Sequence, residues 1–370
     1  MVPAALAALE RAGVEVAIES GAGVAAGFAD AEFSVKGASV VGREDILSSC
    51  PLLLSVRSLA GGHDAEAIGR LGPDSVVVGF LDPLGSPNGV KALAERGATA
   101  FSVEMLPRIT RAQSMDALSS TATVVGYKAV LLAAAALPRM MPMLMTAAGT
   151  VAPARAFVIG AGVAGLQAIA TAKRLGAIVE AYDVRPAVKE QIESLGGKFV
   201  ELPLETGDAE DKGGYAKAQD ESFYRRQREL LQKVVAESDI VISAAAVPGK
   251  QAPVLVTEEM VGGMKPGSVI VDLAAEQGGN CAASSPGETV TRHGVTVMAP
   301  LNLAATIPYH ASQLYARNLA NFVVNLVEDG EPRLDKDDEI VRDSMITRGG
   351  EVVHPRVREA LGLAAASPSA

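Results

Sequence analysis

The sequence contains very little cysteine and no tryptophan. Its two cysteines, Cys50 and Cys281, lie far apart and in no redox or metal-binding spacing. A small secreted scaffold would need many more, so the composition predicts a reducing environment and no disulfide framework. Histidine is equally scarce, and its scattered positions predict no metal site. The four histidines are His63, His293, His310 and His354.

The sequence also lacks an excess of positive charge and an apolar run long enough for a membrane span. It has 33 lysines and arginines against 43 acidic residues, and the net charge of -10 disfavours nucleic acid as a partner. The most apolar region, residues 129–172, is broken by prolines and arginines into pieces shorter than the ~20 residues that a bilayer requires. No basic segment precedes an apolar start, so we expect no signal peptide and a soluble chain.

What is present is the alternation typical of an α/β protein. Hydrophobic residues make up 49% of the 370, enough for two packed domains. Short apolar strands alternate with helical segments, which predicts two Rossmann-like, doubly wound parallel-sheet domains with a cleft between them. The expected domains are 1–117 plus 325–370 and 138–305, and the expected linking helices span about 118–137 and 308–327.

The six strands expected in the second half follow one another as in a doubly wound fold. They span 156–159, 178–182, 198–200, 240–244, 268–272 and 295–298. Strands in the first half are expected at 14–18, 39–41, 52–56, 75–80 and 98–103. Three segments interrupt the alternation. We expect a polar hinge or site loop at 104–120, an irregular connection at 138–153 and a mobile surface loop at 204–222.

A glycine pattern follows the first strand of the second half. The segment Arg155–Ile159 leads into Gly160-Ala-Gly162-Val-Ala-Gly165, and a helix is expected from Val163 onward. Gly160 permits a tight turn, Gly162 lets the backbone approach a pyrophosphate, and Gly165 lets helix and strand pack closely. The helix N-terminus adds free N–H groups and partial positive charge. Gly160, Gly162, Val163 and Gly165 are therefore predicted to form a dinucleotide-binding site.

An acidic residue stands where such a site needs one. Asp183 follows the second strand, about 20 residues beyond the glycines, where a carboxylate accepts hydrogen bonds from a ribose 2′-hydroxyl and repels a 2′-phosphate. This position favours NAD over NADP. Arg185 keeps NADP open, because an arginine can neutralise the phosphate, and a glycine-rich turn without a nucleotide is the structural alternative.

No pair of residues suited to general acid–base catalysis stands near the expected strand ends. His310 is the histidine nearest the expected cleft rim, and a packed histidine at a helix start is the more frequent explanation for it. Hydride transfer between two nicotinamides needs no such pair, because the cofactors carry the reaction. The protein then supplies position and excludes water.

Seven longer segments carry a recognisable pattern, namely 107–116 (PRITRAQSMD), 145–149, 160–176, 189–199, 213–217, 248–255 and 272–281 (DLAAEQGGNC). Together they resemble the alpha subunits of proton-translocating NAD(P) transhydrogenases, which are related to the alanine dehydrogenases. They extend the resemblance over almost the whole chain. It implies hydride transfer between NADH bound to this chain and NADP+ on a partner, coupled to proton translocation.

The resemblance also implies roles for single residues. Arg108, Gln113 and Asp116 are the implied catalytic residues, in contact with the nicotinamide and its ribose, and Gln113 would extend toward the partner's NADP(H). The implied cofactor-binding residues beyond the glycine loop are Ser119, Asp183, Val184, Arg185, Gly214, Tyr215, Gln227 and Ala246. Gly214 and Tyr215 would lie on a mobile loop that closes over the nucleotide.

Partners and location follow from the same resemblance. It implies an NADP(H)-binding beta subunit, a small membrane alpha subunit and a homodimer of this chain. Since no span is expected here, the chain would be cytoplasmic and peripheral at the inner face of the cytoplasmic membrane, held there by its partners.

Three departures from the family pattern keep two alternatives open. The sequence begins within the family's first helix, without the N-terminal strand, and residues 301–310 differ from the usual segment. Ser55 and Phe80 stand where related alanine dehydrogenases have a substrate-binding lysine and a catalytic histidine. The alternatives are a stand-alone, alanine-dehydrogenase-like oxidoreductase, which Ser55 and Phe80 argue against, and a non-catalytic NAD-binding relic.

Overall fold

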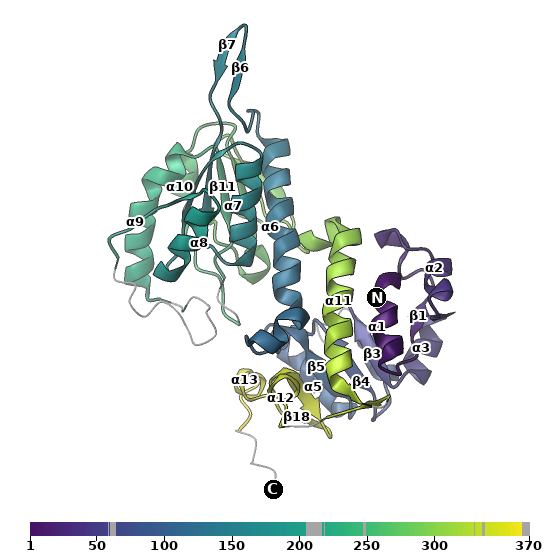
Figure 1. Ribbon diagram of the computed structural model, residues 1–370. Coiled ribbons are helices and arrows are strands. Elements are labelled where there is room, and N and C mark those ends of the chain that lie inside the picture. The colour runs from purple at the N-terminus through teal and green to yellow at the C-terminus, as the bar shows by residue number, and fades with distance from the viewer. Residues whose placement is uncertain are drawn as a thin grey trace. The chain divides into compact units, whose positions relative to one another are not determined.

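The computed structural model has two compact units, each built of strands and helices (Figure 1). It describes residues 1–57, 59, 64–204, 217, 219–246, 249–328, 330–334 and 337–364. Unit 1 comprises Met1–Thr121 and Pro308–Ala370, and unit 2 comprises Ala122–Ile307. Helix α6 (Ala117–Ala136) runs across the first boundary, and α11 (Pro308–Leu326) begins at the second. The alternation of strands and helices in the sequence is confirmed in both units.

The sheet of unit 2 has seven described strands in the order β10-β9-β8-β11-β12-β14-β13. Their bounds are β8 Arg155–Ile159, β9 Ile178–Tyr182, β10 Lys198–Phe199, β11 Ile240–Ser243, β12 Val269–Asp272, β13 Thr289–Arg292 and β14 Val295–Met298. The first six strands in this order are parallel and confirm the doubly wound arrangement. The edge strand β13 runs antiparallel to β14. The sequence does not predict it, because only one of its residues is even half-buried.

Helices cover both faces of this sheet, which explains why its strands are almost wholly apolar. The helices that follow α6 are α7 (Val163–Arg174), α8 (Lys189–Ser194), α9 (Glu221–Glu237) and α10 (Glu258–Gly262). Alternate residues of β8 point to opposite faces of the sheet. Ala156 and Val158 lie in one core with α6, α7 and α8, whereas Phe157 and Ile159 lie in the other with α9 and α10.

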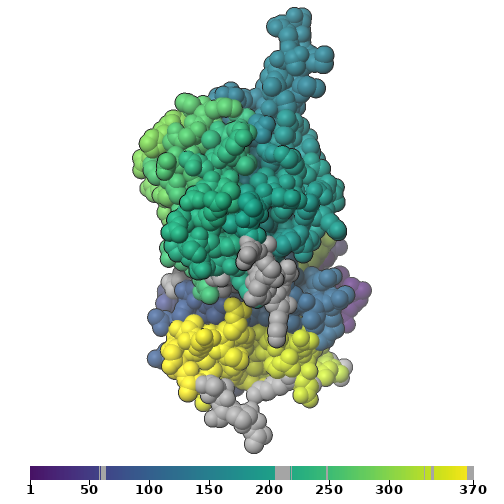
Figure 2. Space-filling model, turned by 90° about the vertical axis from the view of Figure 1, so that its left-hand side faces the viewer, coloured from purple at the N-terminus to yellow at the C-terminus, as the bar shows by residue number. Residues whose placement is uncertain are grey.

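Residues 138–153, expected to be irregular, contain a β-hairpin that projects from unit 2 (Figures 1 and 2). Its strands β6 (Leu144–Thr146) and β7 (Gly149–Val151) pair antiparallel. Thr146 Oγ1 closes the turn, since it accepts from Ala148 N and donates to the carbonyl at the start of β7, each at 3.1 Å. The expectation was wrong because side-chain bonds, rather than an alternating apolar pattern, fix this turn.

Unit 1 has a mixed sheet of five described strands in the order β18-β17-β5-β4-β3 and a separate parallel pair, β1-β2. The bounds are β1 Ala17–Glu19, β2 Ser39–Val41, β3 Leu52–Ser55, β4 Val76–Gly79, β5 Thr99–Ser102, β17 Met345–Arg348 and β18 Glu351–Val352. Strands β3, β4 and β5 are parallel, as the sequence predicts. Strands β17 and β18 are antiparallel additions from the C-terminal segment that the sequence does not predict. Thr347 joins β17 to the sheet by donating to the Ala98 carbonyl at 2.7 Å.

Helix α11 lies at the centre of unit 1. One side of it, with Leu319 and Phe322, packs against β4 and β5, and another, with Ala320 and Val323, packs against α1 (Leu6–Arg11). The other elements of this unit are α2 Asp30–Val35, α3 Arg43–Ser49, α4 Ala65–Arg70, α5 Pro87–Glu95, β15 Val327–Glu328, β16 Glu331–Pro332, α12 Glu339–Ser344 and α13 Pro355–Ala360.

One described helix, α6, is long and apolar enough to cross a membrane by length and composition alone, with a mean hydropathy of 1.4. A helix buried in a protein core can have the same composition. Ala129, Val130 and Ala133 of α6 are fully buried in the core of unit 2, as in a core helix.

Candidate functional site

The glycine loop expected to bind a dinucleotide connects β8 to α7 in unit 2. Gly160 has a left-handed backbone, with a φ of 91°, and its N–H donates to the Tyr182 carbonyl at 2.8 Å. A β-carbon at this position would lie 2.9 Å from the Ala244 carbonyl. The turn therefore requires glycine both for its backbone conformation and for the close approach of the chain after β11.

The other two glycines of the loop have contrasting surroundings. A β-carbon on Gly165 would lie 1.9 Å from the Gly160 carbonyl oxygen, so its absence lets α7 pack onto the loop. A β-carbon on Gly162 would meet no described atom within 4 Å. Gly162 is the exposed N-cap of α7, which starts at Val163, and no described side chain caps this end. No described side chain caps the first N–H groups of the helix, so they are available to an anion.

Asp183 lies directly after β9, buried beside the loop, with 7% of its surface exposed. One carboxylate oxygen accepts from Ala161 N at 2.7 Å and from Arg185 Nη2 at 2.9 Å. The other accepts from Arg185 N and Nε, each at 2.9 Å. These donors fill the four lone-pair positions of the carboxylate. A ribose hydroxyl can bond to Asp183 only by replacing a donor, and the Arg185 side chain is the one that can rotate away. Val184, between them, packs into the core on the α9 side.

Two buried polar atoms near this carboxylate have no hydrogen-bond partner of good geometry among the described residues. They are Tyr182 Oη, at the end of β9, and Gln227 Oε1, on α9. Burial raises the pKa of the Tyr182 hydroxyl to about 12, and the Gln227 side chain beside it opposes that shift. Native folds rarely leave buried polar atoms unpaired, and these two side chains lie close enough to interact with each other.

The loop between β5 and α6 in unit 1 carries the implied catalytic residues. Arg108 is exposed just before the 3₁₀ helix η5 (Thr110–Met115), and Gln113 is exposed on η5. Asp116 is half-buried and caps α6, because its carboxylate accepts from Ser119 N at 2.9 Å and from Ser119 Oγ at 2.6 Å. Asp116 and Ser119 therefore both stabilise the start of α6, a structural role that sequence reasoning missed. The signal was present, since Asp-Ala-Leu-Ser before an apolar helix is a recognisable N-cap.

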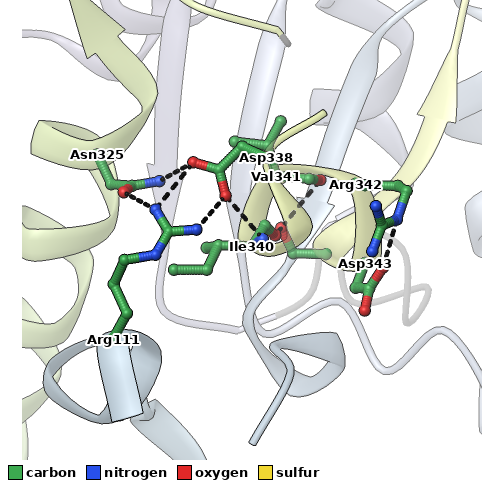
Figure 3. Close-up of polar contacts among 8 residues, drawn as sticks. Arg111, Asn325, Asp338, Ile340, Val341, Arg342 and Asp343 are labelled. Atoms are coloured by element: carbon green, nitrogen blue, oxygen red, sulfur yellow. Dashed lines mark hydrogen bonds and ion pairs between the residues drawn. The ribbon is translucent and has the colours of Figure 1, made fainter. Parts of the chain in front are cut away.

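The same loop is attached to α11 and to the start of α12 by residues that sequence reasoning did not single out (Figure 3). Arg111 donates from Nη2 to Asp338 Oδ1 at 2.7 Å and from Nη1 to Asp338 Oδ2 at 3.1 Å. Asn325 of α11 lies against both partners, with bonds of 3.4 Å to each. A single arginine in a polar loop and an aspartate 227 positions later show no pairing signal in the sequence.

Tyr315 of α11 closes the carboxyl ends of β3 and β4 in unit 1. Its hydroxyl donates to the Ser55 carbonyl at 2.6 Å and accepts from Phe80 N at 3.2 Å. Its ring stacks on Phe80 with centroids 4.9 Å apart. Glu104 lies nearby, accepts from Ser102 Oγ at 2.5 Å, and has its carboxyl pKa raised by burial. The tyrosine thus fixes the ends of β3 and β4 at Ser55 and Phe80.

His310 and Ala246 are both exposed. His310 lies in the first turn of α11 with its ring edge-on to Tyr309, and Ala246 follows β11. Gly214 and Tyr215 lie outside the described residues. Within the described stretches of the chain, no group of three or more His, Cys, Asp or Glu side chains could hold a metal ion.

Comparison with known proteins covers both units. The family model "Alanine dehydrogenase/PNT, N-terminal domain" matches residues 1–125, and "Alanine dehydrogenase/PNT, C-terminal domain" matches residues 129–355. A Rhodospirillum rubrum protein named as the first portion of NAD(P) transhydrogenase subunit alpha is 46% identical over 355 residues, which are 93% of this chain and 91% of that protein.

Two solved structures have the same two-domain α/β fold. A transhydrogenase structure from Sinorhizobium meliloti has a TM-score of 0.82 and 42% sequence identity, covering 95% of this chain and 94% of that one. An L-alanine dehydrogenase structure has a TM-score of 0.80 but only 26% identity, covering 98% of this chain and 94% of that one. The fold class expected from the sequence is therefore confirmed, and the higher identity lies on the transhydrogenase side.

Proposed function

Because the chain belongs to the alanine dehydrogenase/PNT family, we propose that it is the NAD(H)-binding alpha component of a proton-translocating, Re/Si-specific NAD(P) transhydrogenase. It would take part in hydride transfer between NADH and NADP+ held on a partner beta subunit. The observation that carries the proposal is the open N-terminus of α7 beside the buried carboxylate of Asp183. Likeness to the R. rubrum protein over 91% of its length supports the transhydrogenase branch of the family.

The residues of unit 2 suit a dinucleotide. The open space at Gly162 and the first N–H groups of α7, which starts at Val163, suit a pyrophosphate. The unpaired Gln227 oxygen and the exposed Ala246 belong to the same proposed site. NAD(H) would supply the hydride when bound, and the task of the protein is to hold it in place and exclude water.

We infer that this chain holds NAD(H) rather than NADP(H). Asp183 is negatively charged and buried at the position where a 2′-phosphate would be repelled. A bound ribose would displace the Arg185 guanidinium from Asp183, and the carboxylate that stays in place would still repel a 2′-phosphate. A phosphate would have to compete with a carboxylate that is already in place. NADP(H) is therefore assigned to the partner subunit.

The roles in unit 1 rest on the family pattern together with exposure. Arg108 and Gln113 are exposed, as contact with a nicotinamide and with a second subunit's cofactor requires. We assign Asp116 and Ser119 to the nicotinamide ribose, in addition to their capping of α6. Gly214 and Tyr215, which lie outside the described residues, are proposed only as nucleotide-binding residues, on the family resemblance.

We propose three partners. The beta subunit and a small membrane alpha subunit follow from the family resemblance, and the name of the R. rubrum relative, which denotes one part of an alpha subunit, supports a complex of several subunits. The third is a second copy of this chain, because the β6–β7 hairpin projects from unit 2 (Figure 1) and leaves Met143, Met145 and Val151 exposed, and exposed apolar side chains of this kind can be covered at an interface. We further propose that the chain lies at the cytoplasmic face of the membrane and is held there by the small membrane alpha subunit.

A stand-alone alanine dehydrogenase is the second candidate, which the likeness to the L-alanine dehydrogenase structure favours. The ends of β3 and β4 argue against it, because the Ser55 side chain carries no cation, the Phe80 ring has no titratable group, and the backbone there is bonded to the Tyr315 hydroxyl. A non-catalytic relic would bind NADH without any transfer.

Single-turnover hydride transfer distinguishes these candidates. The chain loaded with NADH is mixed by stopped flow with a beta subunit loaded with an NADP+ analogue whose reduced form absorbs at another wavelength. We expect transfer within the first turnover and no NADH oxidation with pyruvate and ammonia. Tight NADH binding without transfer would reject the transhydrogenase proposal in favour of the relic. Turnover of pyruvate and ammonia would select the alanine dehydrogenase.

A further inference from the structure

The loop that presents Gln113 is short and exposed, yet the residues on both sides of Gln113 are tied to other elements of unit 1. Arg111, two residues before it, pairs with Asp338. The carbonyl of Ser114, the residue after it, accepts from two α11 side chains at 3.0 Å each. Gln113 is therefore held between two attachment points, while its own side chain is exposed.

Three asparagines of α11 make these attachments. Asn318 and Asn321 donate to Ser114, and Asn325 bonds to Arg111 and Asp338. They stand at i, i+3 and i+7, so they share one face of the helix. Asparagine is a poor helix former, and three of them on one face are explained by the polar loop that lies on them.

The Arg111–Asp338 pair has the geometry of a directional contact (Figure 3). The guanidinium meets both carboxylate oxygens, and Asp338 Oδ1 also accepts from Ile340 N at 2.9 Å as the cap of α12. The bond from Ile340 N thus orients the Asp338 carboxylate independently of Arg111. The arginine side chain is 54% exposed, so the pair contributes little to overall stability, and its main effect is on where the loop lies.

We propose that Arg111 is a positioning residue for hydride transfer, which it serves by fixing η5 so that Gln113 is presented in one orientation. This inference rests on the proposed function. A misplacement of about 1 Å can slow a reaction by ~100-fold, because reacting groups must lie in a narrow range of distance and angle. NADH affinity, which we assign mainly to unit 2, does not depend on the ion pair.

The test compares Arg111→Ala and Asp338→Asn with Arg342→Ala in the full chain. Asparagine at 338 keeps the helix cap and loses the charge. Arg342 is the matched control, since it forms an ion pair of 3.0 Å with Asp343 on the same helix α12 (Figure 3). Three quantities are measured: hydrogen exchange of the peptide covering 106–116, NADH affinity, and single-turnover transfer to the beta subunit.

We expect faster exchange at 106–116 and roughly 10- to 100-fold slower transfer in Arg111→Ala and Asp338→Asn, with NADH affinity within about threefold of the parent chain. Arg342→Ala should change none of the three. The variant that combines Arg111→Ala and Asp338→Asn should transfer hydride no more slowly than the slower of the two single variants, because each substitution removes the same interaction. Arg111→Lys should restore part of the rate, since lysine keeps the charge without the two-pronged geometry.

The inference would be overturned by unchanged exchange in Arg111→Ala, or by faster exchange with an unchanged transfer rate. A loss of NADH affinity as large as the loss of rate would also overturn it, because the effect would then not be one of positioning. If the parent chain itself transfers no hydride, the proposed function fails. The exchange data would still decide whether the ion pair fixes the loop.

Discussion

Asp183 and Arg185 form a buried ion pair in which guanidinium Nε and Nη2 each bond to a different carboxylate oxygen at 2.9 Å. The pair lies beside the glycine loop, since Ala161 N donates to the same carboxylate. A nucleotide that bonds to Asp183 through its ribose must therefore displace the Arg185 side chain. The carboxylate is pre-positioned by backbone N–H groups that stay in place when the arginine moves.

The first prediction concerns Asp183→Asn. An amide cannot give two acceptor oxygens to a ribose, so we expect NADH affinity to fall by about 1–3 kcal/mol, and discrimination against NADPH to relax because the repelling charge is gone. The chain has no tryptophan, so NADH emission can be titrated without tryptophan background. Glu180→Gln, on the strand that leads to Asp183 and also ion-paired, is the control. NADH affinity equal to that of the parent chain would contradict the ribose contact.

The second prediction contrasts Gly162→Ala with Gly165→Ala. The added methyl at Gly165 would meet a backbone carbonyl at 1.9 Å, which cannot give way, so we expect a loss of at least about 3 kcal/mol in the free energy of unfolding. The methyl at Gly162 meets no described atom within 4 Å, so stability should stay within about 0.5 kcal/mol.

NADH titration completes that comparison. The methyl at Gly162 would occupy the space that we assign to the pyrophosphate, so affinity should fall by about tenfold although the fold is intact. Urea denaturation of both variants measures the stability difference. A Gly162→Ala chain that binds NADH normally would show that the phosphates do not approach this glycine.

Much of unit 2 could be predicted from the sequence because its determinants are local. The strand Arg155–Ile159, the glycines after it and the helix from Val163 follow one another along the chain, and the strands around them are continuous apolar runs. The position of Asp183 follows from the same spacing. Its pairing with Arg185 does not, because the partner of a carboxylate depends on which rotamer a neighbouring side chain adopts.

Unit 1 was harder to predict because its determinants are distant in sequence. Strand β17 joins the sheet beside β5, more than two hundred residues away, and no periodicity reports such a pairing. The attachment of Arg111 to Asp338 spans 227 positions. Family resemblance identified Arg108, Gln113 and Asp116 as a group, but it could not show that Asp116 caps α6 or that Arg111 holds the loop.

The third prediction is for Tyr315→Phe, which keeps the ring and removes the hydroxyl. The Ser55 carbonyl loses its donor and Phe80 N loses its acceptor in a buried place, so we expect a loss of about 1–3 kcal/mol in the free energy of unfolding. NADH affinity should not change, because the contact lies within unit 1. Tyr309→Phe, exposed on the same helix, should stay within about 0.5 kcal/mol. Equal stability of the two variants would show that the hydroxyl does not hold the strand ends.

The fourth prediction is the response of the Arg111–Asp338 pair to acid. The hydrogen bond from Arg111 lowers the pKa of Asp338 from its usual 3.8 to about 2. Since the pKa is lower in the folded chain than in the unfolded one, the pair stabilises the fold above a pH of about 4 and loses that contribution as the pH falls toward 2. The contribution is small and sensitive to salt, because Arg111 is half exposed.

Urea denaturation of the parent chain and of Asp338→Asn at pH 6 and pH 3 measures this response. At pH 6 the parent should be the more stable of the two. At pH 3 the difference should shrink, because the unfolded chain, in which the pKa of Asp338 is close to its usual 3.8, has then mostly protonated this carboxyl, whereas the folded chain still holds it ionised. Added salt at pH 6 should shrink it in the same direction. A difference that stays constant or grows on acidification would mean that Asp338 stabilises the fold as a neutral cap of α12 rather than as the charged partner of Arg111.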